Sequence, residues 1–270
     1  MERYSAASYG DAFADVYDDW YRGVSDVDAT VALLDRLATE AGTDAVLELG
    51  AGTGRLAIPL ADHGLTVTAV DASAAMLVRL RDRDPGNAVT TVLGDMVDDL
   101  PAGPFGVVLV AYNTLFNLPS APRQAACFTA VAARLSPGGS FVVEAFVPED
   151  PPREGSHIEV RSMTATEVVL SVSTHRPAEQ RAEGQFVQLG DGAAVRLRPW
   201  SIRYASPGEL DGMAAVSGLV LRHRWEDVTG APFVADSSRH VSVYGRAADA
   251  HDAAAEGAGA PGVPSRVIHL

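Results

Sequence analysis

The chain has 270 residues, of which 47% are hydrophobic, and this is enough to fill one large domain or one domain with an insertion. Its formal net charge is −14 and it contains no lysine, so chemistry that requires a lysine amine is excluded. It also lacks the dense runs of basic residues from which nucleic-acid binding draws affinity. We therefore expect a small-molecule partner and no nucleic acid.

Membrane insertion and secretion are not expected either. No segment approaches the roughly 18 apolar residues of a membrane-spanning helix, and the first residues are acidic and aromatic rather than basic and then apolar. The single cysteine, Cys127, lies in AACFTAVAARL, a pattern typical of the buried face of a helix. We expect no membrane association and a cytoplasmic protein.

Residues 1–43 are predicted to form a helical leader. Tyr9, Phe13, Tyr17 and Trp20 are three or four residues apart, a spacing that predicts one helix with an aromatic stripe on the core. A second helix is predicted over 28–42, where Gly42 provides the stop.

Residues 44–150 alternate short apolar runs with helical segments, which is typical of a parallel sheet covered by helices. The predicted strands are 45–49, 66–70, 89–93, 105–111 and 140–147. The predicted helices are 54–63, 73–82 and 122–135, the last closed by Pro137, Gly138 and Gly139. Such a doubly wound sheet binds its ligand at the carboxyl ends of the strands.

After Pro148 the pattern changes to strands without helical crossovers. Residues 151–205 are predicted to form a β-rich cap, an antiparallel meander over 155–204. Residues 206–246 return to the core with a helix over 207–217 and strands over 219–227 and 239–245. The Ala-, Gly- and Pro-rich residues 247–270 are predicted to be disordered. The fold class is thus α/β, a doubly wound Rossmann-like sheet with an inserted antiparallel β cap.

The glycine-rich segment after the first strand predicts a nucleotide-type cofactor. Gly50, Gly52 and Gly54 permit a tight turn and close approach of the backbone to a ligand. A dinucleotide site is the alternative, but its third glycine would fall at Arg55, where close packing is needed. The acidic Glu48 suits a pyrophosphate poorly and suits a ligand with ammonium and sulfonium groups well.

Carboxylates follow the next two predicted strands. Asp71 ends the second strand and can accept hydrogen bonds from two ribose hydroxyls, although it could instead cap the helix that begins at Ser73. Asp95, after the third strand, can accept from an adenine amino group, while Met96 and Met76 offer polarisable contacts to the ring. Each methionine taken alone is more typical of a core.

E-x-G-x-G-x-G, then Asp71, then Gly94-Asp95-Met96 resembles the class I S-adenosylmethionine (SAM) dependent methyltransferases over residues 44–148. The aromatic leader, LVAYNTLFNLP and the β-rich cap resemble the small-molecule branch with amino-sugar N-methyltransferases and glycine N-methyltransferase. The segments RYASPGELDGMAAVSGLVLRHRW and PFVADSSRHVSVY resemble actinobacterial members from natural-product pathways. The resemblance implies that the leader covers the cofactor. The cofactor-binding residues it implies are Tyr9, Tyr17, Glu48, Gly50, Ala51, Gly52, Asp71, Ala72, Met76, Asp95, Met96 and Ala111.

The exit of the fourth strand is expected to lie near the transferable methyl group. It has neither the (D/N/S)-P-P-(Y/F) motif of DNA amino-methyltransferases nor the aspartate of metal-dependent catechol enzymes, so we expect neither DNA methylation nor a metal. The candidate catalytic residues are Tyr112, His157 and His175. The candidate substrate-binding residues are Tyr21, Asn113, Phe116 and Glu144, the last also a candidate base. Each has a structural alternative as a turn, strand or core residue.

Methyl transfer from a sulfonium needs alignment and desolvation more than a strong base, because the leaving group is already activated. We therefore expect a proximity-driven methyltransferase of natural-product metabolism whose cap selects the acceptor and which forms a homodimer through that cap. Three alternatives remain open: a NAD(P)-dependent oxidoreductase with a degenerate fingerprint, a SAM-binding protein that does not methylate, and a protein methyltransferase. The residues leave open whether nitrogen, oxygen or carbon is methylated.

Overall fold

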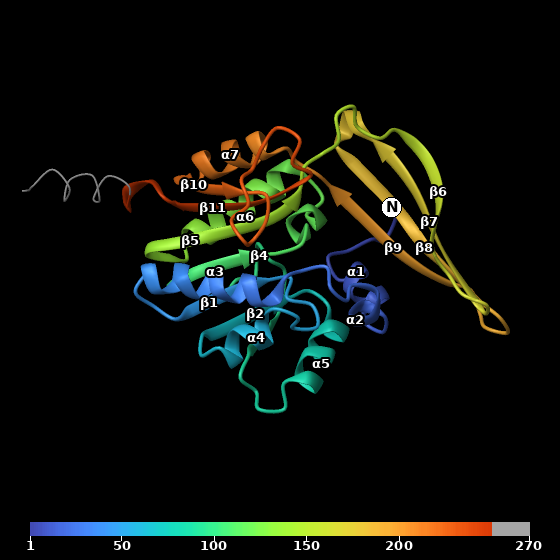
Figure 1. Cartoon of the computed structure of the whole chain (residues 1–270), viewed down its shortest axis with the longest axis horizontal. Helices are drawn as coiled ribbons and strands as arrows, with labels where there is room; N and C mark the ends of the chain where they lie inside the picture. Colours follow the sequence, from blue (N-terminus) through green and yellow to red (C-terminus); the bar gives the residue numbers. More distant parts are fainter. Residues whose placement is uncertain (250–270) are drawn as a thin grey trace, which may run out of the picture.

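The core of the computed structural model is a seven-stranded sheet with strand order β10-β11-β5-β4-β1-β2-β3 (Figure 1). The structure describes residues 1–249, so the predicted disorder of 250–270 lies outside the described residues. The strands of this sheet are β1 Ala45–Leu49, β2 Thr66–Asp71, β3 Thr90–Leu93, β4 Phe105–Val110, β5 Leu135–Phe146, β10 Leu219–Trp225 and β11 Arg239–Arg246.

Strands β1 to β5 pair in parallel, and β11 and β10 add an antiparallel edge. Helices α3 (Val27–Glu40), α4 (Ala57–Asp62) and α5 (Ala74–Arg83) contribute to one apolar cluster, and α6 (Ala121–Ala132) and α7 (Pro207–Val216) to the other. The two clusters correspond to the two faces of a doubly wound sheet, which places a ligand site at the carboxyl ends of β1, β2 and β4. The predicted α/β fold class is confirmed.

The leader departs from the prediction of one continuous helix. It forms two short helices, α1 (Ser8–Phe13) and α2 (Tyr17–Trp20), separated at Asp15. Arg196 and Arg198 of the cap both form ion pairs with the Asp15 carboxylate, and Arg198 also donates to the Ala12 carbonyl. These long-range contacts hold the chain in a break that the local aromatic spacing does not encode.

The prediction that Pro137, Gly138 and Gly139 end a helix is also wrong. Helix α6 already ends at Ala132, and the three residues lie within β5. The first residues of the expected tail contact the core as well: the Asp249 carboxylate accepts a hydrogen bond from the Gly138 N–H at 2.9 Å.

The predicted antiparallel meander forms a separate four-stranded sheet of β6 Gly155–Met163, β7 Glu167–Arg176, β8 Arg181–Gly190 and β9 Arg196–Arg203 (Figure 1). Residues directly opposite each other on antiparallel strands point to the same face. On the inner face, Phe186 packs edge-on against Phe13 and Trp20 of the leader. The inner face of the cap sheet therefore packs against the leader.

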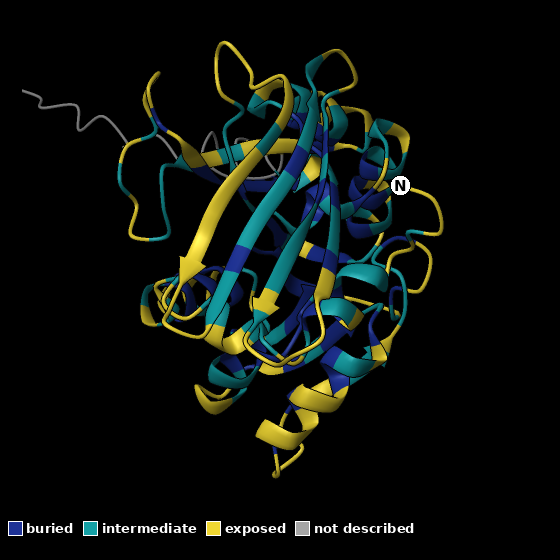
Figure 2. Cartoon of the chain, turned by 90° about the vertical axis from the view of Figure 1, so that its right-hand side faces the viewer, coloured by how far each residue is buried: buried dark blue, intermediate teal, exposed yellow. Residues whose placement is uncertain are grey.

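The outer face of the cap sheet contains two largely apolar cross-strand rows. Their members are Ile158, Val172, Gln185 and Pro199, and Val160, Leu170, Val187 and Leu197. Ile158 is 71% exposed and Leu197 60%. Figure 2 shows this sheet from outside, with β6 exposed along most of its length.

No helix within residues 1–249 is long and apolar enough to cross a membrane.

Candidate active site

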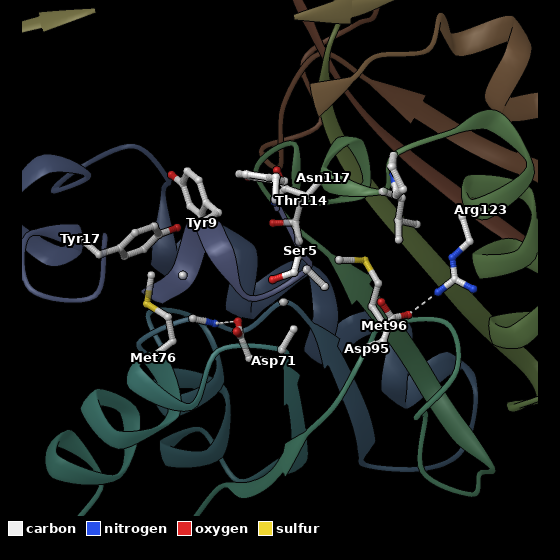
Figure 3. A pocket seen from close by; sticks show the side chains of 18 residues that line it. Ser5, Tyr9, Tyr17, Asp71, Met76, Asp95, Met96, Thr114, Asn117 and Arg123 are labelled. Atoms are coloured by element: carbon white, nitrogen blue, oxygen red, sulfur yellow. Dashed lines mark hydrogen bonds and ion pairs between the residues drawn. The ribbon is translucent and has the colours of Figure 1, made fainter. Parts of the chain in front are cut away.

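A cavity of about 270 Å³ lies at the carboxyl ends of the core strands, under the leader (Figure 3). Of the predicted cofactor residues, it is lined by Tyr9, Tyr17, Gly50, Gly52, Asp71, Ala72, Met76, Asp95 and Met96. Ala51 and Ala111 are buried beside it without lining it, each 6% exposed. The structure thus brings together side chains from the leader and from three separate strand ends.

The turn after β1 has the conformation for which glycine was predicted. Gly50 has φ +66° and Gly52 φ +58°, which lie in the left-handed region where a residue with a side chain would be strained. A Cβ on Gly50 would lie 2.3 Å from the Thr114 Cγ2 atom. Any larger residue at Gly50 would therefore have to displace Thr114 from the cavity wall.

Asp71 is fixed by two backbone donors. Its Oδ2 accepts from the Gly52 N–H and its Oδ1 from the Ser73 N–H, both at 2.8 Å. Burial raises the pKa of Asp71, while these two hydrogen bonds lower it. Ser73, not Asp71, caps helix α5, so the alternative role of Asp71 as the cap is wrong.

Glu48 lies below the glycine turn, 4% exposed and outside the cavity lining. Burial, opposed by the charge of Arg55 and assisted by that of Asp71, raises its pKa to about 8. The Arg55 guanidinium lies 5.8 Å from the centre of the Tyr112 ring. Its Nε and Nη1 atoms are buried and have no hydrogen-bond partner among the described residues, nor has Glu48 Oε2. In the sequence, Arg55 marks only the absence of a dinucleotide site, and nothing there predicts this buried position.

Four tyrosines lie close together at this site, and two of them, Tyr9 and Tyr17, line the first cavity. The Tyr9 hydroxyl donates to the Tyr21 hydroxyl at 2.9 Å, and the Tyr21 ring lies 4.8 Å from the Tyr17 ring and 6.0 Å from the Tyr112 ring. Burial raises the pKa of Tyr9 and Tyr112, and that of Tyr17 to about 12. These side chains are therefore protonated phenols at neutral pH.

Tyr112 and Asn113, at the exit of β4, both have left-handed backbone angles, φ +44° and +65°, which cost about 1–3 kcal/mol each in non-glycine residues. Their N–H groups donate to Glu144, at Oε2 (3.0 Å) and at the backbone oxygen (2.9 Å) respectively. The Asn113 Oδ1 accepts from the Phe146 N–H at 2.6 Å. Glu144 and Asn113, predicted to bind substrate, thus brace the turn that presents Tyr112.

The remaining candidates lie elsewhere. Phe116 is fully buried against Phe146, with ring centres 5.0 Å apart, so its ring belongs to the core. His157 and His175 lie in the cap with ring centres 5.5 Å apart, and neither lines the first cavity. Burial, followed by the charge of Arg153, lowers the pKa of His175.

His175 instead lines a second cavity of about 360 Å³ between the cap and the end of β5. Its lining residues are Phe146, Val147, Pro148, Glu149, Pro152, Arg153, His175, Ala182, Ile202, Tyr204 and Ser238. The two cavities share no lining residue. Within residues 1–249, no group of three or more His, Cys, Asp or Glu side chains is arranged to hold a metal ion.

Several residues of the first cavity were not predicted: Tyr4, Ser5, Ala6, Gly10, Thr114, Asn117, Leu118, Pro119 and Arg123. Gly10 has a structural reason to be glycine, because a Cβ there would lie 2.4 Å from the Ser73 Cβ atom. A side chain at Gly10 would keep the leader away from α5. Thr114, Asn117, Leu118 and Pro119 lie in the segment LVAYNTLFNLP, which carries the family resemblance. Arg123 reaches the cavity through long-range packing, for which the sequence has no local pattern.

Comparisons with known proteins agree with this geometry. The methyltransferase domain family matches residues 46–139. The structure of the CcbJ methyltransferase from Streptomyces caelestis is 40% identical, with a TM-score of 0.82, over 90% of this chain and all of that one. The chain belongs to the SAM-dependent methyltransferases, and the resemblance found in its sequence is confirmed.

Two further relatives extend the comparison. The cypemycin N-terminal methyltransferase from Streptomyces sp is 29% identical over 205 residues, covering 74% of this chain and 82% of that protein. SAM-bound CalS10 of Micromonospora echinaspora, an amino pentose methyltransferase involved in calicheamicin biosynthesis, is 22% identical, with a TM-score of 0.63, and the match covers 84% of this chain and 96% of CalS10. CalS10 shares the fold. SAM is the cofactor of this enzyme.

Proposed function

We propose that this enzyme transfers the methyl group of SAM to an amine nitrogen of a small natural-product molecule held between core and cap. The observation that carries the proposal is the first cavity, where Asp71 and Asp95 lie at successive strand ends beneath a layer of tyrosines (Figure 3). The cavity fits the cofactor, because carboxylates can accept hydrogen bonds from the ribose hydroxyls and the adenine amino group. The glycine turn allows the methionine end of the cofactor to approach the backbone closely.

In this assignment Asp71 binds the ribose hydroxyls and Asp95 the adenine amino group, with Met96 and Met76 against the ring. Gly50 and Gly52 approach the methionine end. Tyr17 and Arg55 are suited to its carboxylate, because the buried Nε and Nη1 donors of Arg55 lack partners among the described residues and a buried donor without a partner costs about 1–3 kcal/mol.

The second cavity is the proposed acceptor site. Core residues such as Phe146 and cap residues such as His175 and Ile202 contribute to its walls. Apolar walls with a few polar groups are typical of small-molecule sites. This position supports a role of the cap in acceptor selection.

The protonation state of the tyrosines supports an amine acceptor. When bound, SAM supplies a methyl group on a positively charged sulfur. Tyr9, Tyr17 and Tyr112 have raised pKa values, so they are poor bases at neutral pH and do not readily activate a hydroxyl acceptor. A neutral amine needs no such activation: its lone pair forms the N–CH₃ bond while the C–S electron pair goes to sulfur, and its proton is released afterwards.

The names of two relatives also support an amine acceptor. The cypemycin enzyme is named for an N-terminus and CalS10 for an amino pentose. The chain contributes position and exclusion of water, and well-oriented reactions of this kind reach effective molarities of about 10⁵ M or more.

The test is methylation of a panel of natural-product precursors that carry a primary or secondary amine, with the N-acetylated form of each compound as its matched control. We expect mass gains of one methyl group on the free amines alone, without added metal. Methylation of the N-acetylated compounds at a hydroxyl would contradict the amine assignment. Binding of NADH in place of S-adenosylhomocysteine (SAH) would favour the oxidoreductase alternative.

A homodimer through the cap is a second part of the proposal. The apolar outer face of β6 to β9 is exposed, and an exposed apolar patch of this kind is typical of an interface. Ile158→Asp with Val160→Asp should halve the mass seen by light scattering, whereas Val216→Asp, at an 89% exposed site on α7, should not. A wild-type chain that is monomeric at micromolar concentration would contradict it.

A further inference from the structure

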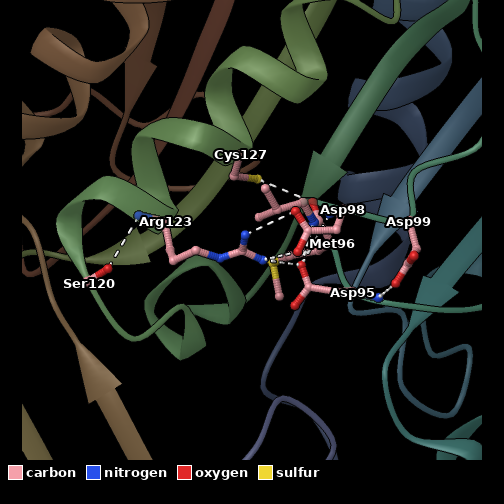
Figure 4. A network of polar contacts seen from close by, with 8 residues as sticks. Asp95, Met96, Asp98, Asp99, Ser120, Arg123 and Cys127 are labelled. Carbon is pink, nitrogen blue, oxygen red and sulfur yellow. Dashed lines mark hydrogen bonds and ion pairs between the residues drawn. The ribbon is translucent and has the colours of Figure 1, made fainter.

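Arg123 links helix α6 to the loop that follows β3. Its Nη2 atom donates to the Asp95 Oδ1 atom at 2.7 Å and to the Asp98 Oδ2 atom at 2.9 Å, and its Nη1 donates to the Asp98 Oδ1 atom at 3.0 Å (Figure 4). Arg123 is in the first turn of α6, whose N-cap Ser120 accepts from the Arg123 N–H. The guanidinium thus joins two carboxylates to one helix terminus.

These contacts occupy one side of Asp95 only. Its Oδ1 accepts from Arg123 and also from the Val97 N–H at 2.8 Å, and its own N–H donates to Asp99 at 2.8 Å. Its Oδ2 accepts no hydrogen bond from the described residues, while Asp95 lines the first cavity. The carboxylate is therefore anchored by one oxygen and retains the other for a ligand (Figure 3).

Stability alone does not account for this arrangement. The side chains of Arg123 and Asp95 are 33% and 25% exposed, and ion pairs with this exposure contribute little to folding free energy. The two Asp98 oxygens hold the guanidinium as a bidentate pair, and from this fixed position its Nη2 donates one charge-assisted hydrogen bond to Asp95 Oδ1. Fixed geometry of a ligand-contacting group is the usual contribution of a supporting residue to a binding site.

We propose that Arg123 is a positioning residue that sets the base specificity of the cofactor site. It fixes Asp95 so that Oδ2 accepts the exocyclic amino group of adenine and opposes a purine with a carbonyl oxygen at that position. The inference rests on the proposed contact of Asp95 with adenine and is independent of the acceptor.

The physical reason is the restricted rotation of Asp95. An anchored carboxylate cannot turn away from a carbonyl oxygen, so two acceptors are held face to face and the wrong base loses a hydrogen bond as well. A site built to hydrogen-bond one group rejects an analogue that lacks it far more strongly than an adaptable site does. Without Arg123, only backbone N–H groups would anchor Asp95 Oδ1, so the carboxylate would rotate more freely and the penalty for the wrong base would fall.

The experiment measures dissociation constants by calorimetry for SAH and for its deaminated analogue S-inosylhomocysteine. We expect the wild-type protein to favour SAH by about 50-fold or more. Arg123→Gln should lower that ratio about tenfold, and Arg123→Lys, which keeps one charge but not the bidentate fork, should give a value between the two. Arg81→Gln, at an arginine that binds Thr91 outside the cavity, should leave the ratio unchanged.

The ratio of the two dissociation constants distinguishes a positioning role of Arg123 from a purely structural one. If Arg123→Gln and Arg123→Lys weaken both ligands equally, the residue is only structural and the inference is overturned. Asp95→Asn tests the underlying assignment, because its amide can donate to the carbonyl of the analogue and should remove the preference for SAH. A preference that survives Asp95→Asn would overturn the adenine contact itself, whereas loss in Asp95→Asn but not in either Arg123 variant would overturn the role of Arg123 alone.

Discussion

The two sheets of this enzyme differ in what their side chains face. In the core sheet, β4 is buried throughout, and the polar groups of the cofactor site come from the turns at the strand ends. In the cap sheet, the outer face is apolar and exposed, and the inner face holds the leader and one wall of the second cavity. In the proposed function, cofactor binding belongs to strand ends and acceptor selection to a strand face.

The leader connects the two regions. Phe13 and Trp20 pack on Phe186 of the cap, while Tyr9 and Tyr17 line the cofactor cavity. The leader therefore contacts both the first cavity and the cap, but it contributes no lining residue to the second cavity. Substitutions that distinguish the two sites should therefore avoid the leader.

The largest effect is expected for Asp71→Asn. The amide keeps the size but loses the charge and one acceptor, and hydrogen bonds to charged groups contribute about 1.5–3 kcal/mol each. The dissociation constant of SAH should rise on the order of 100-fold, as measured by calorimetry. Asp62→Asn, at the exposed end of α4, is the matched control, and equal affinity in both variants would refute the ribose assignment.

A smaller effect, confined to the acceptor, is expected for His175→Trp, which fills the second cavity. The kcat/KM for the acceptor found in the amine panel should fall about tenfold, because a misfitted pocket loses roughly 1–3 kcal/mol. The SAH dissociation constant should stay within about twofold, since His175 does not line the first cavity. A parallel loss of SAH affinity would show that the two sites are not separate. His63→Trp, at the exposed C-cap of α4, serves as control.

Tyr112→Phe should lower kcat less than about tenfold and leave the pH profile of kcat unchanged, because the proposed reaction depends on proximity rather than on a base. General-base catalysis by this residue would cost about 10²–10⁴-fold. The raised pKa of Tyr112 supports the smaller value. Steady-state rates between pH 6 and 9 distinguish the two outcomes.

Glu48→Gln should affect stability rather than binding specificity. Because the pKa of Glu48 is raised in the folded state from 4.5 to about 8, the unfolded chain loses the proton first, and stability falls as pH rises through that interval. Glu48→Gln should avoid part of this loss of stability. The Tm of the variant minus that of the wild type should be higher at pH 8.5 than at pH 4.5, by on the order of 5 °C. Parallel Tm curves for the two proteins, measured without cofactor, would show that Glu48 ionises normally.

The sequence predicts the core site well because its signals are local. Gly50 and Asp95 follow their strands by one and two residues, and Asp71 is the last residue of its strand, so their convergence is a consequence of parallel topology. Their position in the cavity agrees with that expectation. Arg123 has no such signal: its contact with Asp95 spans 28 residues and depends on where α6 begins relative to β3.

The leader and cap were less predictable for the same reason. The break at Asp15 depends on Arg198, 183 residues away in the chain, while the aromatic spacing favours a continuous helix. The alternation of the cap strands predicts two faces but does not specify which one packs on the leader. Likewise, Glu144 alternates as an ordinary strand residue, and its hydrogen bond to the Tyr112 N–H arises from a left-handed turn with no glycine to mark it.

The most direct test of the division between core and cap is a crystal structure with SAH. The account predicts the adenine amino group at Asp95 Oδ2, the ribose at Asp71 and the sulfur beside Tyr112, facing the cavity formed with the cap. A reversed adenosyl group, or a sulfur directed away from Tyr112 and the cap, would contradict it.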